Sequence, residues 1–160
     1  MTTQEAYELM RIYLTRPGAR RAVIWGGSAC MYEMVEMGEV HRCAVGCLLS
    51  PETLNQTRYI SLEIAEELGF HERSQVGSSV RLADLRGGLS AVVGLKYDVP
   101  ELEEVDGGFL EEAQFIHDNK ENWVGGKFNV VALDVLAADY DLTVVRDEPV
   151  REEPRELISA

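Results

Sequence analysis

The sequence predicts a single α+β domain that is mostly helical and carries one small β-hairpin. Three observations predict this class. Apolar residues recur at helical spacing near both ends of the chain, Thr-x-x-Glu and Ser-Pro-Glu mark helix starts, and two strand-like runs flank Met37-Gly38. We expect the domain to span residues 1–146. Residues 147–160 alternate acids, arginine and proline, which predicts an acidic, disordered C-terminal tail.

The first helix is predicted by both its start and its apolar face. Thr2 and Glu5 have the spacing of a capping box, in which each residue satisfies a backbone N–H of the first turn. Pro17-Gly18 predicts the end of the helix, because proline cannot continue it. The apolar stripe comprises Ala6, Met10, Tyr13 and Leu14.

Residues 29–45 predict a β-hairpin whose turn is centred on Met37-Gly38. A two-residue or a four-residue loop gives the same register, in which paired residue numbers sum to 75 and Glu33 faces Arg42. One face of the hairpin then carries Cys30, Tyr32, Met34, His41, Cys43 and Val45. The prediction therefore brings two cysteines and a histidine to one face, unless the register slips by one residue.

The centre of the chain carries two further helix starts. Ser50-Pro51-Glu52 combines an N-cap serine, a proline at the first helical position and an acid in the first turn. A second helix is expected over Ser61–Leu68, with Gly69 as its stop. Residues 71–108 carry the weakest signals, and within them Leu89–Leu95 fits a short strand or a helical turn.

The last third predicts two helices. The segment Phe109–His117 has Leu110, Ala113 and His117 on one face. After the break at Gly125-Gly126, residues 127–138 predict a second helix. Its expected buried stripe is Phe128, Val131, Val135 and Ala138, widened by Leu136.

The composition limits the class of partner. The formal net charge is -13 and the sequence pI is about 4.6, so we expect no direct nucleic-acid binding and no binding to an anionic membrane. The first residues have no basic and apolar signal pattern, and no apolar run is long enough to span a bilayer. We therefore expect a cytoplasmic protein whose three cysteines are reduced thiols.

Four short motifs carry a resemblance to a known group. They are Cys30-Met31-Tyr32, the run from Arg42 to Glu52 (RCAVGCLLSPE), Gln114-Phe115-Ile116-His117-Asp118 and Trp123. This set resembles an uncharacterised family of small phage and bacterial proteins with Cys-Ala-x-Gly-Cys-Leu and Gln-x-x-His-Asp motifs. The resemblance covers residues 28–52 and 109–138. It implies an accessory protein of a bacterial host cytosol, and it implies no activity.

The cysteines and histidines allow a metal site as one alternative. Three residues separate Cys43 from Cys47, and Cys30, His41 and His117 are candidates to complete a ligand set. A structural zinc ion needs four thiolate or imidazole ligands in tetrahedral array. Only one such pair of cysteines exists, and apolar neighbours surround it, so we favour buried core thiols and expect no cofactor.

A thiol-dependent enzyme is the chemical alternative. Cys47 or Cys43 would be the nucleophile and His117 the base, with Asp118 or another polar group orienting the imidazole. Cys47 would gain reactivity if it lay near a helix N-terminus. However, adjacent side chains on a helix point about 100° apart, so Asp118 is expected to be poorly placed to hold His117. We therefore prefer a protein without catalysis.

The acidic segment before Phe109 is the expected contact surface for a protein partner. Its candidate residues are Glu101, Glu103, Glu104 and Asp106, joined by Trp123, although a core role for Trp123 is the favoured interpretation. The preferred function is protein–protein interaction with an unidentified partner, such as a protein of the host. A second alternative is a nucleic-acid mimic whose carboxylates imitate phosphates and bind a basic host protein.

Overall fold

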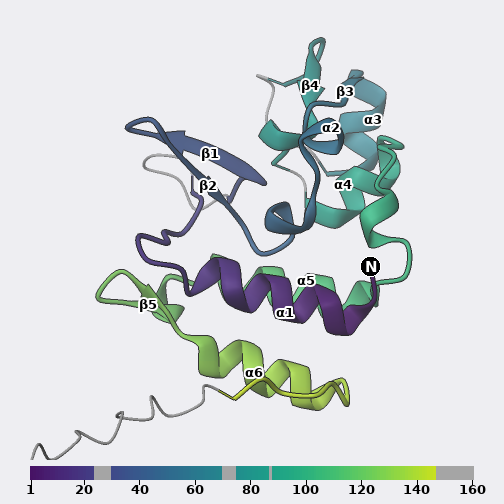
Figure 1. Ribbon diagram of the computed structural model, residues 1–160. Coiled ribbons are helices and arrows are strands. Elements are labelled where there is room, and N and C mark those ends of the chain that lie inside the picture. The colour runs from purple at the N-terminus through teal and green to yellow at the C-terminus, as the bar shows by residue number, and fades with distance from the viewer. Residues whose placement is uncertain (24–29, 70–74, 87, 147–160) are drawn as a thin grey trace, which may run out of the picture.

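Helix α1 (Thr3–Leu14) lies in the middle of the computed structural model, between α6 (Val130–Asp139) on one side and the first two strand pairs and the short helices on the other (Figure 1). The structure describes residues 1–23, 30–69, 75–86 and 88–146. The predicted tail, 147–160, and Ala29 of the predicted hairpin lie outside these residues. The remaining helices are α2 (Pro51–Leu54), α3 (Leu62–Glu67), α4 (Gly88–Gly94) and α5 (Gly107–Asp118), with single turns η1 (Gly46–Leu48), η2 (Leu82–Asp84), η3 (Pro100–Leu102) and η4 (Lys120–Asn122).

The strands of the described part form three antiparallel pairs. They are β1 (Glu33–Glu36) with β2 (Glu39–Arg42), β3 (Thr57–Tyr59) with β4 (Ser79–Arg81), and β5 (Trp123–Val124) with β6 (Lys127–Phe128). This combination of helices and small sheets confirms the predicted α+β class.

The predicted register of the first hairpin is confirmed. Glu33 pairs with Arg42 and Met34 with His41, so the paired numbers sum to 75. Met37 and Gly38 both have positive φ, 51° and 78°, as the tightest hairpin turns require. The expected inner face is buried, since Tyr32, His41 and Cys43 are at most 5% exposed.

The predicted start of α1 is also confirmed. The Thr2 hydroxyl accepts a hydrogen bond of 3.1 Å from the Glu5 N–H, as a capping residue does. Farther along α1, the Tyr7 hydroxyl donates to Asp134 at 2.5 Å, and Arg11 pairs with the same carboxylate at 3.0 Å. These bonds fix α1 against α6, because Arg11 is almost fully buried and needs an anionic partner there.

In the centre, Ser50 and Ser61 cap α2 and α3 as predicted. Residues 89–94 are helical, which decides between the two alternatives that the sequence leaves open. The pairing of β3 with β4 was not predicted, since three-residue strands are too short to show a periodic pattern.

The predicted buried stripe of the last helix is confirmed only for Phe128 and Leu136. Val131 and Val135 are 63% and 56% exposed, and Ala138 is exposed as well. Leu133 and Ala137, outside the predicted stripe, are buried instead. The helix also begins at Val130, because residues 127–128 belong to β6. Apolar residues occur on every side of this helix, so their spacing does not select one face.

Buried apolar side chains of the described residues form one cluster, to which all the longer helices contribute. The close approach of Gly46 to Tyr32 joins the hairpin to this cluster. A Cβ atom at Gly46 would overlap the Tyr32 carbonyl group, so only glycine fits there. The result is a hairpin whose inner face lies against η1 and α5, where the predicted thiol site would lie.

Candidate functional site

The predicted thiol site is assembled differently from the expected set. The ligand atoms of Cys30, His117 and Asp118 lie within 4.8 Å of one another. Cys43 lines the same small cavity as Cys30 and Asp118. Cys47 is not part of this group: its S–H donates to the Ala44 carbonyl at 3.0 Å. Cys30, which the catalytic hypothesis did not use, is therefore the thiol beside His117.

The expectation that Asp118 cannot hold the His117 ring is wrong. His117 Nδ1 lies 2.9 Å from Asp118 Oδ1, and Gln114 Nε2 donates to the same oxygen at 2.6 Å. Asp118 is the last residue of α5, and the chain leaves the helix at Asn119 in an extended conformation. The carboxylate is therefore free to turn towards the neighbouring ring, despite the angle between adjacent positions on a helix.

Hydrogen bonds indicate the tautomer of His117. The Ala22 N–H donates to Nε2 at 3.4 Å, so a neutral ring carries its proton on Nδ1 and donates it to Asp118. In that tautomer Nδ1 has no lone pair for a metal ion or for the Cys30 proton. Zinc binding through Nδ1 would therefore require the His117 ring proton to leave Nδ1 and the Cys30 thiol to lose its proton.

The electrostatics of the three thiols disfavour nucleophilic chemistry. Burial raises the pKa of Cys43 to about 12, and it raises the pKa of Cys30 and Cys47 well above the usual range. Reactive cysteines have a lowered pKa, because the thiolate is the attacking species. The pKa of Cys47 is not lowered as predicted. Cys47 lies within the single turn η1, and burial of its thiol disfavours the thiolate.

His41 is buried on the inner face of the hairpin but does not join the thiols. Its Nδ1 lies 3.4 Å from an Arg16 nitrogen, and its Nε2 lies 3.6 Å from a Glu39 oxygen. The structure therefore divides the predicted ligands. His41 faces charged side chains and Cys47 bonds the Ala44 carbonyl, whereas Cys30, Cys43 and His117 lie near Asp118.

Two of the four residues of the predicted acidic surface make hydrogen bonds within the fold. The Glu101 carboxylate accepts hydrogen bonds from Thr53 at 2.8 Å and from Ser50 at 3.1 Å, so it joins η3 to α2. Asp106 is the N-cap of α5, accepting from the Phe109 N–H at 3.1 Å. Glu103 and Glu104 are exposed and remain candidates for partner contact.

Trp123 is held by internal contacts. Its indole N–H donates to the His117 carbonyl at 2.9 Å, and its ring packs against the rings of His117 and Phe128 at centroid distances of 5.6 and 5.1 Å. These contacts support the core role that the sequence analysis favoured.

An apolar groove lies between α4 and the first turns of α5, next to the acidic segment. Its volume is about 720 Å³, and its apolar lining includes Leu89, Val92, Val93, Leu102, Val105 and Leu110. Three acidic residues, Asp98, Glu103 and Glu111, complete the wall, and none of the described residues that line it is basic. Val93 is 77% exposed, so the apolar surface is accessible from solvent. Sequence reasoning missed this groove because α4 was ambiguous, although the run of apolar residues at 89–95 was the available signal.

Comparison of the chain with protein-family models, curated proteins and solved structures found no match. Among the helices of the described residues, none has the length and apolar character needed to cross a membrane.

Proposed function

We propose that the protein is a non-catalytic interaction protein that binds a basic, amphipathic segment of a partner protein in the groove between α4 and α5. The single observation behind this proposal is the groove itself, which combines an accessible apolar surface with acidic residues and no basic lining residue. From the resemblance to small phage and bacterial proteins, we further propose that it acts as an accessory protein in a bacterial cytosol, with a host protein as the partner.

The groove composition supports this partner chemistry. Apolar side chains of the partner would displace water from Val93 and Leu102, which supplies the driving force. Glu103 and Glu111 would attract lysine or arginine at the edges of the segment and disfavour acidic partners. A helix with apolar residues at i, i+3, i+4 and i+7 is the usual ligand of such a groove. A phosphate mimic would present carboxylates without this apolar surface, so the nucleic-acid mimic is the weaker alternative.

A designed peptide tests the groove directly. The probe is a helical peptide with leucines at i, i+3, i+4 and i+7 and flanking lysines, titrated by calorimetry against the full chain. We expect Val93→Ser and Glu103→Gln each to weaken binding about fivefold, on the order of 1 kcal/mol. The matched controls are Val35→Ser, at another exposed valine, and Glu121→Gln, at another exposed glutamate. Equal losses in the control variants, or no binding of the peptide, would contradict the proposal.

Affinity purification from bacterial cells then identifies the partner. The tagged chain, the double variant Val93→Ser/Glu103→Gln and the control Val35→Ser/Glu121→Gln are compared by mass spectrometry, together with a chain that ends at Arg146. We expect the partner to be lost only with the groove variant, and to carry a basic amphipathic segment. A basic DNA-binding protein that is retained by the groove variant and released by salt would favour the nucleic-acid mimic instead.

A further inference from the structure

A second pocket lies where the C-terminal end of α1 meets the β5–β6 hairpin, and it has the opposite charge. Its volume is about 880 Å³. Four basic residues line it, Arg16, Arg20, Arg21 and Lys127, and no acidic residue occurs among the described residues of its wall. For a chain with a formal net charge of -13, this local concentration of cations is the reverse of the average surface.

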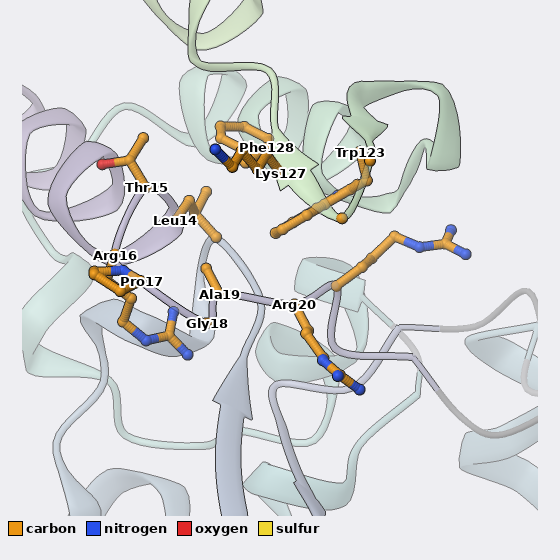
Figure 2. Close-up of a pocket in the computed structure, with 13 residues that line it drawn as sticks. Leu14, Thr15, Arg16, Pro17, Gly18, Ala19, Arg20, Trp123, Lys127 and Phe128 are labelled. Atoms are coloured by element: carbon orange, nitrogen blue, oxygen red, sulfur yellow. The ribbon is translucent and has the colours of Figure 1, made fainter.

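The residues that line the pocket come from two parts of the chain. Figure 2 shows Trp123, Lys127 and Phe128 on one side and Arg16 and Arg20 on the other, with Leu14 and Ala19 between them. The guanidinium groups of Arg16 and Arg20 lie at the outer edge of the pocket and point away from Phe128. The apolar floor is fixed, because Leu14, Ala19 and Phe128 are buried and the Trp123 indole N–H is bonded to the His117 carbonyl. Gly125 and Gly126 form the hairpin turn with positive φ, and they add no side chains to the wall.

Two of the four cations are held in place by the ends of helices. Arg16 donates to the Tyr13 carbonyl at 2.7 Å and stacks on the Tyr13 ring at 3.6 Å. Arg21 donates to the carbonyl of Asp118 at 2.7 Å, at the end of α5. These contacts place positive charge at the C-terminal ends of α1 and α5, where the helix dipoles favour it. Arg16 also lies 3.4 Å from His41 Nδ1.

The other two basic residues, Arg20 and Lys127, do not bind a helix end in the described part of the chain. Arg20 is 63% exposed and pairs with Glu36 only at 3.8 Å, a distance that adds little stability. Lys127 is exposed, and its side chain has no hydrogen bond or ion pair with the described residues. These two exposed cations are therefore able to pair with an anion bound at the pocket.

We propose that this pocket binds a nucleoside phosphate. The exposed side chains of Arg20 and Lys127 would turn towards the phosphate groups, because one guanidinium group can donate two N–H bonds to a phosphate. The base would pack on the apolar floor beside Trp123. The volume suits a ligand of this size, since small-molecule sites occupy about 300–1,000 Å³. This site is separate from the peptide groove and does not depend on the function proposed for it.

Calorimetric titration of the full chain tests the proposal. The probes are the four ribonucleoside diphosphates, with adenosine and pyrophosphate as the two halves of one of them. We expect at least one diphosphate to bind about tenfold or more tightly than either half. Arg20→Gln and Lys127→Gln should each weaken that binding about tenfold, whereas Lys96→Gln, at an exposed lysine outside the pocket, should leave it unchanged.

Three results would overturn the proposal. The first is the absence of binding by all four diphosphates at millimolar concentration. The second is pyrophosphate binding as tight as that of the best diphosphate, which would make the pocket a site for the anion alone. The third is an equal loss of affinity in Lys96→Gln, which would indicate general electrostatic attraction. Because the replaced side chains are exposed, we expect each variant to fold, and circular dichroism verifies this.

Discussion

Burial decides the chemistry of Cys43. The side chain is 1% exposed, and its sulfur accepts a hydrogen bond of 3.2 Å from the Gly46 N–H. Although that bond favours the thiolate, desolvation outweighs it and raises the pKa to about 12. The thiol is therefore protonated and unreactive near neutral pH, which is consistent with a core residue rather than a nucleophile.

This raised pKa predicts a loss of stability at alkaline pH. Above pH 9, the ordinary pKa of the thiol, the unfolded chain releases the Cys43 proton and the folded chain keeps it until about pH 12. The free energy of unfolding therefore falls as pH rises, by about 1.4 kcal/mol per pH unit from this thiol. Urea unfolding at pH 8 to 10.5 should show a shallower decline in Cys43→Ala than in the wild type. Parallel profiles for the two proteins would contradict the assignment.

Gly46 allows the hairpin to approach η1 closely. A side chain at this position would overlap the Tyr32 carbonyl group, so Gly46→Ala must displace the hairpin from η1. We expect a loss of about 3 kcal/mol in the free energy of unfolding, measured with urea. Gly107→Ala is the control, because a Cβ there meets no atom and alanine favours a helix. Equal stability of the two variants would mean that the close approach is not required.

Helix α6 buries a different face from the one that its sequence spacing predicts. Leu133 is fully buried, whereas Val131 and Val135 face solvent. We predict that Leu133→Ala lowers the free energy of unfolding by about 3 kcal/mol, because it leaves a cavity. Val131→Ser and Val135→Ser should each change it by about 0.5 kcal/mol or less. The reverse order, measured by urea unfolding, would restore the stripe that the sequence spacing suggested.

Local signals determine which elements the sequence predicts well. The capping residues of α1 and the Met37-Gly38 turn act within a few residues, so the helix start and the hairpin register follow from the sequence. The buried face of α6 depends on the position of α1, whose Tyr7 and Arg11 bind Asp134 of α6. No local sequence pattern encodes that long-range contact. For the same reason the hairpin pattern predicts that Cys30 and Cys43 face inwards, but not that α5 brings His117 and Asp118 beside Cys30.

In the whole molecule, the two pockets lie near opposite ends of the same pair of helices. Asp106 beside α5 donates its N–H to Thr3 at the start of α1, and Arg21 beyond the end of α1 bonds the last residue of α5. The two helices therefore run parallel, each of them 12 residues or about 18 Å long. The groove near their N-terminal ends is lined by the acids Asp98, Glu103 and Glu111, and the pocket near the C-terminal end of α1 by four basic residues. The two proposed sites therefore differ in the sign of their charge.

The last described residues of the chain are bound to α1. Gln4 of α1 exchanges two hydrogen bonds of 2.9 Å with the backbone of Thr143, and the Val145 N–H donates to the Tyr7 hydroxyl at 3.1 Å. Leu142, Val144 and Val145 also pack against the buried cluster. Residues 142–145 therefore form part of the domain and lie along α1.

Two truncations separate this segment from the acidic residues that follow it. We predict that a chain ending at Arg146 keeps the wild-type free energy of unfolding to within about 0.5 kcal/mol. A chain ending at Asp141 should lose roughly 3 kcal/mol, because it lacks the three hydrogen bonds and the apolar contacts. Urea unfolding followed by circular dichroism measures both. If the chain ending at Arg146 were as unstable as the shorter one, the stabilising contacts would lie beyond residue 146, and the predicted boundary of the domain would be wrong.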